Sequence, residues 1–350
     1  MFRKSVILSL VLCTCFLQFC KKNDDTATNP VSVLNLPATP YNYSNISFPA
    51  HIANDLLIND NTPANNHITD AGATLGRVLF YDKNLSSNKT ISCASCHKQA
   101  DGFTDKEVFS RGFDGGLTSR HSMNTLNVRF YRSGKMFWDE RAATLELQVL
   151  MPIQNHVEMG LTLTELVSRV QNLSYYPALF TSAFGSATID TTNISKALAQ
   201  FVRSIVTYQS KYDKVKQGLA TFTAAEAQGE NIFLNAQPPA GGLTCASCHT
   251  PPMFMNSAGP PFGLPDPIDL GINNSGHFKV GSLRNIGSAS SLFHNGSIAN
   301  VAAMLNAGPP PAGVPAHGIP PQGRTNVLAF LNTLTDSTVL TDVRFSSPFR

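Results

Sequence analysis

Two short stretches of this chain, Cys93-Ala94-Ser95-Cys96-His97 and Cys245-Ala246-Ser247-Cys248-His249, have the same five residues in the same order. The repeat extends upstream, because Gly76-Arg77-Val78-Leu79-Phe80 is echoed by Gly229-Glu230-Asn231-Ile232-Phe233. The glycine precedes the histidine by 21 residues in the first copy and by 20 in the second. This spacing indicates a duplicated unit of helix, loop and Cys-x-x-Cys-His, and therefore two related domains.

Cys-x-x-Cys-His is the attachment signature of c-type haem: the two thiols add to the vinyl groups and the imidazole of the next residue binds the iron. A thioredoxin-like redox pair would lie in a βαβ pattern and needs no histidine. A zinc site would need four ligands from paired knuckles, whereas each pair here is already followed by its own histidine. The sequence therefore predicts two covalently bound haem c groups, attached and ligated by Cys93, Cys96, His97, Cys245, Cys248 and His249.

The composition is that of a globular chain. Its 350 residues leave room for two domains, and 42% of them are hydrophobic. Charged residues make up 14%, against about 25% in average soluble domains. These values exclude a charged disordered chain. The net charge of +3 gives no basic patch, so nucleic acid is not an expected partner. The oligomeric state is left open, a homodimer included.

The N-terminus has the pattern of an export signal. The short positive region Met1–Lys4 is followed by an apolar run, Val6–Phe19, that is too short to span a bilayer. Cys20 follows at once, as in a bacterial lipoprotein signal, although Phe19 departs from the small residue usual before that cysteine. We therefore expect a signal peptide over 1–20 and a polar tether over 21–45. The expected location is the periplasm-facing side or the cell surface, with a lipid on Cys20 anchoring the protein to the outer membrane. An ordinary secretory signal, which would leave a soluble protein, is the alternative.

The domains are expected to be helical, because strand signals are weak throughout. Apolar residues recur at helical spacing between the two motifs, and this helix closes the first domain: Ala197, Leu198, Phe201, Val202, Ile205 and Val206. A capping box at Thr223 and Glu226 then opens the next helix. We place the first domain at 46–218 and the second at 219–340. Segments rich in proline and glycine at 236–242, 258–267 and 308–323 are expected to be loops.

An ordered set of further motifs runs along the chain. They are Leu75–Asp82, Asn124–Asn127, Phe137–Ala142, Pro152–Met159, Phe278–Asn285 and Phe293–Gly296. Together with the two haem motifs, this set resembles the bacterial dihaem cytochrome c peroxidase and MauG family over roughly residues 45 to 335. The resemblance implies a mainly α fold in which two cytochrome c-like domains, each with one covalent haem, pack across a cleft.

The resemblance also implies roles for single residues. The haem on His97 is expected to react with peroxide, and the haem on His249 to receive electrons. Glu158 matches the catalytic glutamate, which moves a proton between the two peroxide oxygens, and Gln148 matches a second residue of the distal pocket. Phe137 and Pro152 match the apolar walls of that pocket. From the residue alone, Glu158 is equally a cap or surface carboxylate ahead of a helix near 162–171.

Trp138 is the only tryptophan of the chain. A lone tryptophan is more often a core residue than a redox relay. The resemblance nevertheless places Trp138 between the haems, where its indole can carry an electron or a hole.

Two departures from the family pattern concern the first haem. The stretch Phe109–Leu117 lacks the histidine with which many family members close the resting haem. We therefore expect an open, high-spin haem, as in the MauG branch. His121 stands where the family has an asparagine that helps to bind calcium, which leaves calcium open because imidazole is a poor calcium ligand. A structural role is expected for His121, with distal ligation as the alternative.

The distal ligand of the second haem also departs from the pattern. The family supplies Met or Tyr about fourteen residues after the histidine that corresponds to His294, and that count reaches Gly308, which cannot ligate. Met304 lies one turn earlier on the same helix face and is the expected ligand, with a core methionine as the alternative. His317 is the second candidate. His294 itself fits the family's cleft histidine.

The expected function is reduction of hydrogen peroxide to water with electrons from a small cytochrome c or copper protein. Two haems suit this reaction because the donor delivers single electrons. A MauG-like oxidase that acts on a partner protein is the second hypothesis, and the missing distal tyrosine counts against it. A non-enzymatic dihaem electron carrier is the third, but it would need both irons six-coordinate.

Overall fold

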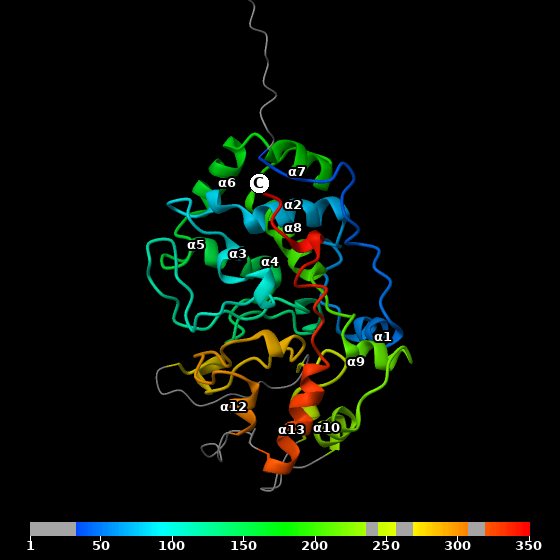
Figure 1. Ribbon diagram of the computed structural model, residues 1–350. Helices are drawn as coiled ribbons and strands as arrows, with labels where there is room; N and C mark the ends of the chain where they lie inside the picture. Colours follow the sequence, from blue (N-terminus) through cyan, green and yellow to red (C-terminus); the bar gives the residue numbers. More distant parts are fainter. Residues whose placement is uncertain (1–32, 236–243, 257–268, 307–318) are drawn as a thin grey trace, which may run out of the picture. The chain divides into compact units, whose positions relative to one another are not determined.

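The computed structural model describes residues 33–235, 244–256, 269–306 and 319–350 (Figure 1). Residues Leu34–Arg350 form one compact unit. Within the described ranges the regular structure is helical, with isolated β-bridges and no strand. This confirms the mainly α fold. None of the described helices is both long and apolar enough to cross a membrane.

The helices are mostly short. The α-helices are α1 (Ala50–Asn59), α2 (Asp70–Tyr81), α3 (Cys93–Cys96), α4 (Leu145–Gln148), α5 (Met151–Gln154), α6 (Leu163–Asn172), α7 (Tyr176–Phe184), α8 (Thr191–Ser204), α9 (Lys211–Lys216), α10 (Ala224–Asn235), α11 (Cys245–Cys248), α12 (Val301–Leu305) and α13 (Pro321–Asn332). The 3₁₀ turns are η1 (Lys83–Leu85), η2 (Gln99–Asp101), η3 (Val128–Phe130), η4 (Ile272–Asn274), η5 (Ile286–Ser288) and η6 (Val343–Phe345).

Local sequence explains where the longer helices begin. The predicted capping box before α10 is present, since Thr223 N donates to Glu226 Oε2 and Glu226 N donates to Thr223 Oγ1. The helix predicted between the haem motifs is α8, which Asp190 caps by accepting from Asn193 N. The helix ends at Ser204, so Ile205 and Val206 lie beyond it and not on it as predicted. Both side chains are nevertheless buried.

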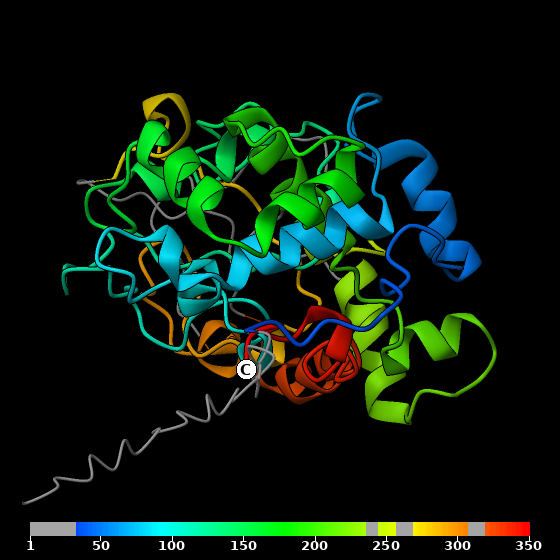
Figure 2. The same cartoon turned by 90° about the horizontal axis from the view of Figure 1, so that it is seen from above.

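The repeated glycines allow two equivalent helix crossings, α2 on α8 and α10 on α13 (Figures 1 and 2). A Cβ at Gly76 would lie 2.0 Å from Ala197 O, and a Cβ at Gly229 would lie 1.9 Å from Asn326 O. Only glycine leaves room for backbone this close. The segments that begin at Gly76 and Gly229 therefore repeat in helix packing as well as in sequence.

The duplication continues in the backbone after each haem motif. Asn127 and Asn285 both adopt left-handed conformations, with φ of 62° and 60°. Each side chain accepts from the segment that follows the closing helix of its half: Asn127 Oδ1 from Thr207 N at 2.9 Å, and Asn285 Oδ1 from Asp336 N at 3.1 Å. Each asparagine therefore ties its haem-motif region to the last helix of its own half.

Trp138 and His294 occupy equivalent places in the two halves, because each follows a phenylalanine with a strained backbone. Phe137 and Phe293, which precede them, have φ of 73° and 68°. Each lies within an equivalent bridged turn, closed by Met136 with Ala142 and by Leu292 with Ile298. Trp138 and His294 are therefore the same position of the two halves.

The buried hydrophobic side chains form two clusters. One is built on α2, α7 and α8, and the other on α10 and α13. The C-terminal segment after α13 returns to the first cluster through Val339 and Phe345 (Figure 1). The predicted boundary near residue 218 falls between α9 and α10, and the domain limits stay a prediction. The expected signal peptide, with Cys20, and residues 21–32 of the expected tether lie outside the described residues.

Candidate active site

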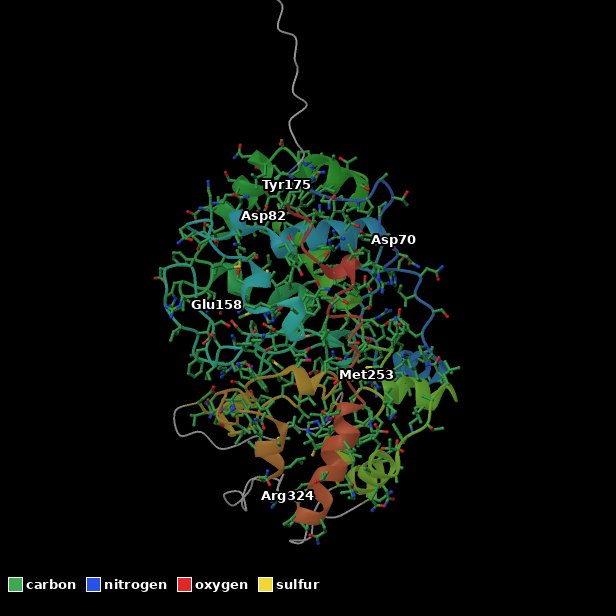
Figure 3. The ribbon with its side chains drawn as sticks, in the orientation of Figure 1. Asp70, Asp82, Glu158, Tyr175, Met253 and Arg324 are labelled. Atoms are coloured by element: carbon green, nitrogen blue, oxygen red, sulfur yellow. The ribbon has the colours of Figure 1, made fainter. Side chains whose placement is uncertain are left out.

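The larger cavity carries the first Cys-x-x-Cys-His motif on its wall. Its volume is about 840 Å³, within the range of about 300–1,000 Å³ found for ligand and cofactor sites. Cys93, Cys96 and His97 line it together with Gln148 and Glu158. The structure therefore brings the residues expected for the first haem together with those expected for its distal pocket (Figure 3 labels Glu158).

The donor set in this cavity fits a c-type haem. His97 Nδ1 lies 3.1 Å from Phe103 O. A backbone carbonyl only accepts, so Nδ1 carries the proton and Nε2 keeps the lone pair that an iron ligand needs. Burial lowers the pKa of His97, which favours the neutral form. Cys93 and Cys96 form no disulfide, so both sulfur atoms can form thioether bonds.

A smaller neighbouring cavity, of about 170 Å³, carries the second motif. Cys248 and His249 line it, and His249 Nδ1 lies 3.3 Å from Phe254 O, the same arrangement as in the first half. Cys245 begins the same short helix α11. Met304, on α12, lines this cavity as well. Its role as an iron ligand stays a prediction, and Gly308 and His317 lie outside the described residues.

Glu158 is a partly buried carboxyl group at the first cavity. Its Oε1 accepts from Asn155 Nδ2 at 2.9 Å. Burial raises the pKa of Glu158, and the nearby charge of Arg141 opposes that rise. The alternative of a helix cap is wrong, because α6 is capped by Thr162 in a capping box with Glu165. Glu158 therefore lies in the cavity wall with a pKa that burial has raised.

Gln148 is the last residue of α4, and a buried ion pair fixes this short helix. Arg203, which is 2% exposed, donates to both carboxylate oxygens of Glu146 at 2.5 and 3.1 Å. Thr144 caps the first turn by accepting from Leu147 N. These contacts hold the end of α4, and with it Gln148, at the cavity.

The stretch Phe109–Leu117 packs against the backbone of the Glu158 loop. Phe113 N donates to Glu158 O at 3.0 Å. A Cβ at Gly112 would lie 1.6 Å from Val157 O, so the two backbones are in direct contact. His121 lies beyond this stretch, and its Nδ1 is 3.0 Å from Val108 O. The loop thus closes one side of the cavity without an imidazole of its own.

Seven residues line both cavities: His121, Ser122, Met123, Asn124, Trp138, Lys279 and His294. Trp138 Nε1 donates to His121 O at 2.8 Å, and His121 N donates to His294 O at 2.7 Å. The Trp138 and His294 rings are 6.5 Å apart, and Phe278 stacks on His294 at 3.5 Å. The indole is therefore fixed between the two cavities by contacts from both halves.

Sequence reasoning missed a chain of charges beside Trp138. Arg120 lies 2.7 Å from Asp139 Oδ2, and its Nε and Nη2 donate to Asp269 at 2.5 and 2.7 Å. Arg141 Nη1 donates to Asp139 Oδ1 at 2.8 Å. Burial alone would raise the pKa of Asp139, but these two arginines outweigh it and lower the pKa. The sequence contained a signal for these charges, since Asp139 and Arg141 lie in the Phe137–Ala142 motif. It does not show which residues they pair with.

Lys279 was missed as well. Its Nζ donates to Glu140 Oε1 at 2.8 Å, its backbone N donates to Trp138 O, and only 4% of the residue is exposed. For calcium, the described residues contain no cluster of three or more His, Cys, Asp or Glu side chains that could hold a metal ion. Calcium stays open, because backbone carbonyls also bind it.

Two Cys-x-x-Cys-His helices at adjacent cavities, with an indole and an imidazole fixed between them, define the class of two-haem c-type proteins. The model of the family described as di-haem cytochrome c peroxidase matches residues 70–221. The methylamine utilization protein MauG of Methylophilus methylotrophus is 31% identical over 252 residues, which are 69% of this chain and 73% of that protein.

Two further comparisons agree. The cytochrome c551 peroxidase of Nitrosomonas europaea is 31% identical over 242 residues, which are 65% of this chain and 70% of that protein. The crystal structure of a MauG-like protein associated with microbial copper homeostasis is similar with a TM-score of 0.76 at 28% identity, covering 87% of this chain and 99% of that one. The chain belongs to the di-haem cytochrome c peroxidase and MauG family, which implies two haem c groups and typically a periplasmic location.

Proposed function

We propose that this protein is a dihaem peroxidase that reduces hydrogen peroxide to water with single electrons from a small cytochrome c or copper protein. One observation carries the proposal: Glu158 lies in the wall of the cavity that also holds Cys93, Cys96 and His97. A carboxyl group there can exchange protons with a molecule bound in the cavity.

Bound haem supplies the iron at which peroxide is reduced. Glu158 would take a proton from one oxygen of the peroxide and return it to the departing oxygen, so that water leaves. Its raised pKa suits both transfers, because the group has to accept a proton and then release it. Asn155 holds Oε1 at 2.9 Å and so orients the carboxyl group. Gln148 and Arg141, which line the same cavity, orient the substrate through hydrogen bonds.

Electrons enter through the second half of the molecule. His249 and Met304 line the smaller cavity and are the proposed ligands of the electron-transfer haem. Methionine ligation would raise the reduction potential of this haem and so suit electron entry. Trp138, in the wall of both cavities, is the proposed relay between the halves.

The absence of histidine from Phe109–Leu117 supports a first haem that is open at rest. The expected resting spectrum is that of high-spin ferric haem, without prior reduction of the second haem. A low-spin spectrum of both haems would contradict this and favour the electron carrier.

The proposed location is the periplasm-facing side of the outer membrane, with a lipid on Cys20. Labelling of the expressed protein with radioactive palmitate should be lost in Cys20→Ala. Palmitate labelling that persists in this variant would overturn the anchor, and absence of labelling from the wild type would favour an ordinary secretory signal.

The decisive experiment uses haem-loaded protein from a strain that matures c-type cytochromes. Peroxide-dependent oxidation of reduced cytochrome c is followed for the wild type and for Glu158→Gln. Rapid turnover that collapses in the variant supports the peroxidase with Glu158 as its acid and base. Unchanged turnover in Glu158→Gln would reject that role. If peroxide leaves the haem spectrum unchanged, both enzyme functions fail.

The MauG-like function is the second candidate, and the split among the relatives supports it. MauG of Methylophilus methylotrophus and the peroxidase of Nitrosomonas europaea are both 31% identical to this chain. In this case Trp138 would draw electrons from side chains of a partner protein. A wild type that reacts with peroxide but oxidises no small donor would place this candidate first.

A further inference from the structure

Tyr175 and Tyr176 share one carboxylate oxygen. Both phenols donate to Asp82 Oδ2 at 2.7 Å, and the two rings are 4.7 Å apart (Figure 3 shows Tyr175 and Asp82 together near the end of α2). Asp82 is 1% exposed and Tyr176 is fully buried, whereas Tyr175 is half-buried. The pair therefore leads from the interior to the surface, with a buried carboxylate at its centre.

The interior end of this pair lies near the first haem motif. Tyr176, at the start of α7, belongs to the buried cluster against which Cys93 packs. Asp82 directly follows α2, whose Phe80 lines the larger cavity and lies 6.5 Å from the His97 ring. Tyr176 and Phe80 belong to the same buried cluster, so packed side chains connect the tyrosine pair to the cavity wall.

Oxidation of a tyrosine by one electron makes its phenol strongly acidic, so the proton has to pass to a base. A carboxylate that already accepts the phenol hydrogen bond is such a base. Burial and the charge of Asp82 raise the pKa of Tyr176. The phenol is thus protonated at rest and loses electron and proton together.

We propose that Tyr175 and Tyr176 form a one-electron oxidation site that carries oxidising equivalents from the first cavity to the surface, with Asp82 as the proton acceptor. In each event one phenol loses an electron toward the cavity and its proton passes to Asp82 Oδ2. The products are a neutral tyrosyl radical and a protonated Asp82. A small one-electron reductant at the surface, together with return of the proton, restores the phenol.

This inference rests on the proposed reaction, in which hydrogen peroxide is the oxidant and takes two electrons and two protons to give two waters. The site acts when the protein donor is scarce. Met136 and Met159 are buried and line the same cavity, so unspent oxidising equivalents can oxidise their sulfur atoms. Removal of those equivalents through the tyrosine pair protects these methionines.

The chain offers a matched control in Tyr81. Its ring lies 5.4 Å from Phe80, so it is also near the cavity wall. However, its hydroxyl donates to a backbone carbonyl, Phe345 O at 2.6 Å. A carbonyl cannot keep the proton, so Tyr81 should not form the radical.

The first test mixes ferric holoprotein with one equivalent of hydrogen peroxide, without donor, and freezes the sample for electron paramagnetic resonance. Protein with ring-deuterated tyrosine assigns the signal. We expect a tyrosyl radical in the wild type and in Tyr81→Phe, and its loss in the Tyr175→Phe, Tyr176→Phe double variant and in Asp82→Asn. Mass spectrometry should show more sulfoxide at Met136 and Met159 in the double variant. A wild type without a tyrosyl signal, or an unchanged signal in the double variant, overturns the inference.

A second arm oxidises the same holoproteins with a photogenerated ruthenium(III) complex, which needs no peroxide. If peroxide is not consumed, the proposed function fails, and this arm still decides on the tyrosine site. A radical that forms equally in the wild type and in the double variant would overturn the site. Should Asp82→Asn fail to fold, the tyrosine variants decide, because they keep both rings and the carboxylate.

Discussion

Glu158 shows how position alone changes the chemistry of a residue. Burial at the cavity raises its pKa, and the nearby charge of Arg141 opposes that rise without cancelling it. A group suited to proton transfer in this way is held in the folded state at a cost in stability.

The first prediction concerns Glu158→Gln. Peroxidase kcat should fall by about 10²–10⁴-fold, the usual contribution of a positioned acid or base. The acid limb of the wild-type pH profile should disappear with it, because the wild type loses its base as the pH falls through the raised pKa of Glu158. The measurement is kcat against pH. A variant that keeps the acid limb would assign that limb to another group.

Although Glu158→Gln should lower activity, it should not lower the stability of the fold at neutral pH. A carboxyl group with a raised folded-state pKa destabilises the fold once the pH exceeds its unfolded pKa, since ionisation is less favourable in the folded state. Glu158→Gln should therefore match or exceed the wild-type Tm at neutral pH, and the difference should vanish at acidic pH. Thermal unfolding at several pH values tests this, and a lower Tm at neutral pH would contradict it.

At the scale of helices, the two closest crossings depend on single glycines. Gly76→Ala should destabilise the fold by about 1–3 kcal/mol, because the new methyl meets the backbone of α8 and forces the helices apart. Gly323→Ala is the control. Its Cβ would have Ile232 Cδ1 at 3.5 Å, an ordinary contact, so the gain in helix propensity of about 0.5–1 kcal/mol should appear. Urea unfolding of the two variants should shift in opposite directions.

A buried ion pair links α9 to the region after the second haem motif. Asp213 and Arg284 are both fully buried and pair through two contacts of 2.7 and 2.9 Å, while His51 of α1 lies 2.9 Å from Asp213. Arg284 Nε also donates to Pro252 O, three residues after His249. This pair holds three separate segments together.

Asp213→Asn should cost about 3–5 kcal/mol, because Arg284 then keeps a buried charge without a partner. Burial alone would raise the pKa of Asp213, but the hydrogen bonds from Arg284 and His51 outweigh it and lower the pKa. The stabilisation is therefore present above the unfolded pKa of about 3.9 and is lost as the pH falls below it. Denaturant unfolding between neutral and acidic pH should show this slope in the wild type and a weaker one in Asp213→Asn.

At the scale of the whole molecule, two repeated halves meet around Trp138 and His294. The halves supply different side chains at the same position, an indole and an imidazole, and Arg120 reaches carboxylates on both sides of the junction. The wall shared by the two cavities therefore depends on contacts that neither half makes alone.

Arg120→Gln should loosen this junction with little change in either haem motif. We expect reduced donor-dependent turnover while the rate of the initial reaction with peroxide stays near the wild-type value, because the contact of Glu158 with Asn155 is unaltered. Stopped-flow spectra separate the two rates. Arg129→Gln is the control, since Arg129 pairs with Asp60 away from the cavities. Equal losses in both variants would show a general effect on folding.

Much of the fold and site followed from residue patterns. The identical pentapeptides and their matching glycines predicted a duplication, which appears as two equivalent helix crossings. The capping box at Thr223 and the helical spacing around Leu198 predicted α10 and α8. These predictions were possible because the spacing of the haem motif, helix capping and helix periodicity are local properties of the chain.

The two haem motifs, the helical class and the family could be predicted from the sequence, because they depend on short motifs and on the local periodicity of the chain. The folded structure was needed to show that Arg120 bridges Asp139 and Asp269, that Lys279 pairs with Glu140, and that two tyrosines share Asp82. Their partners lie from tens of residues to well over a hundred residues away. Such pairs form where folding removes water from charged and polar groups, and no local pattern specifies which distant partner will be there.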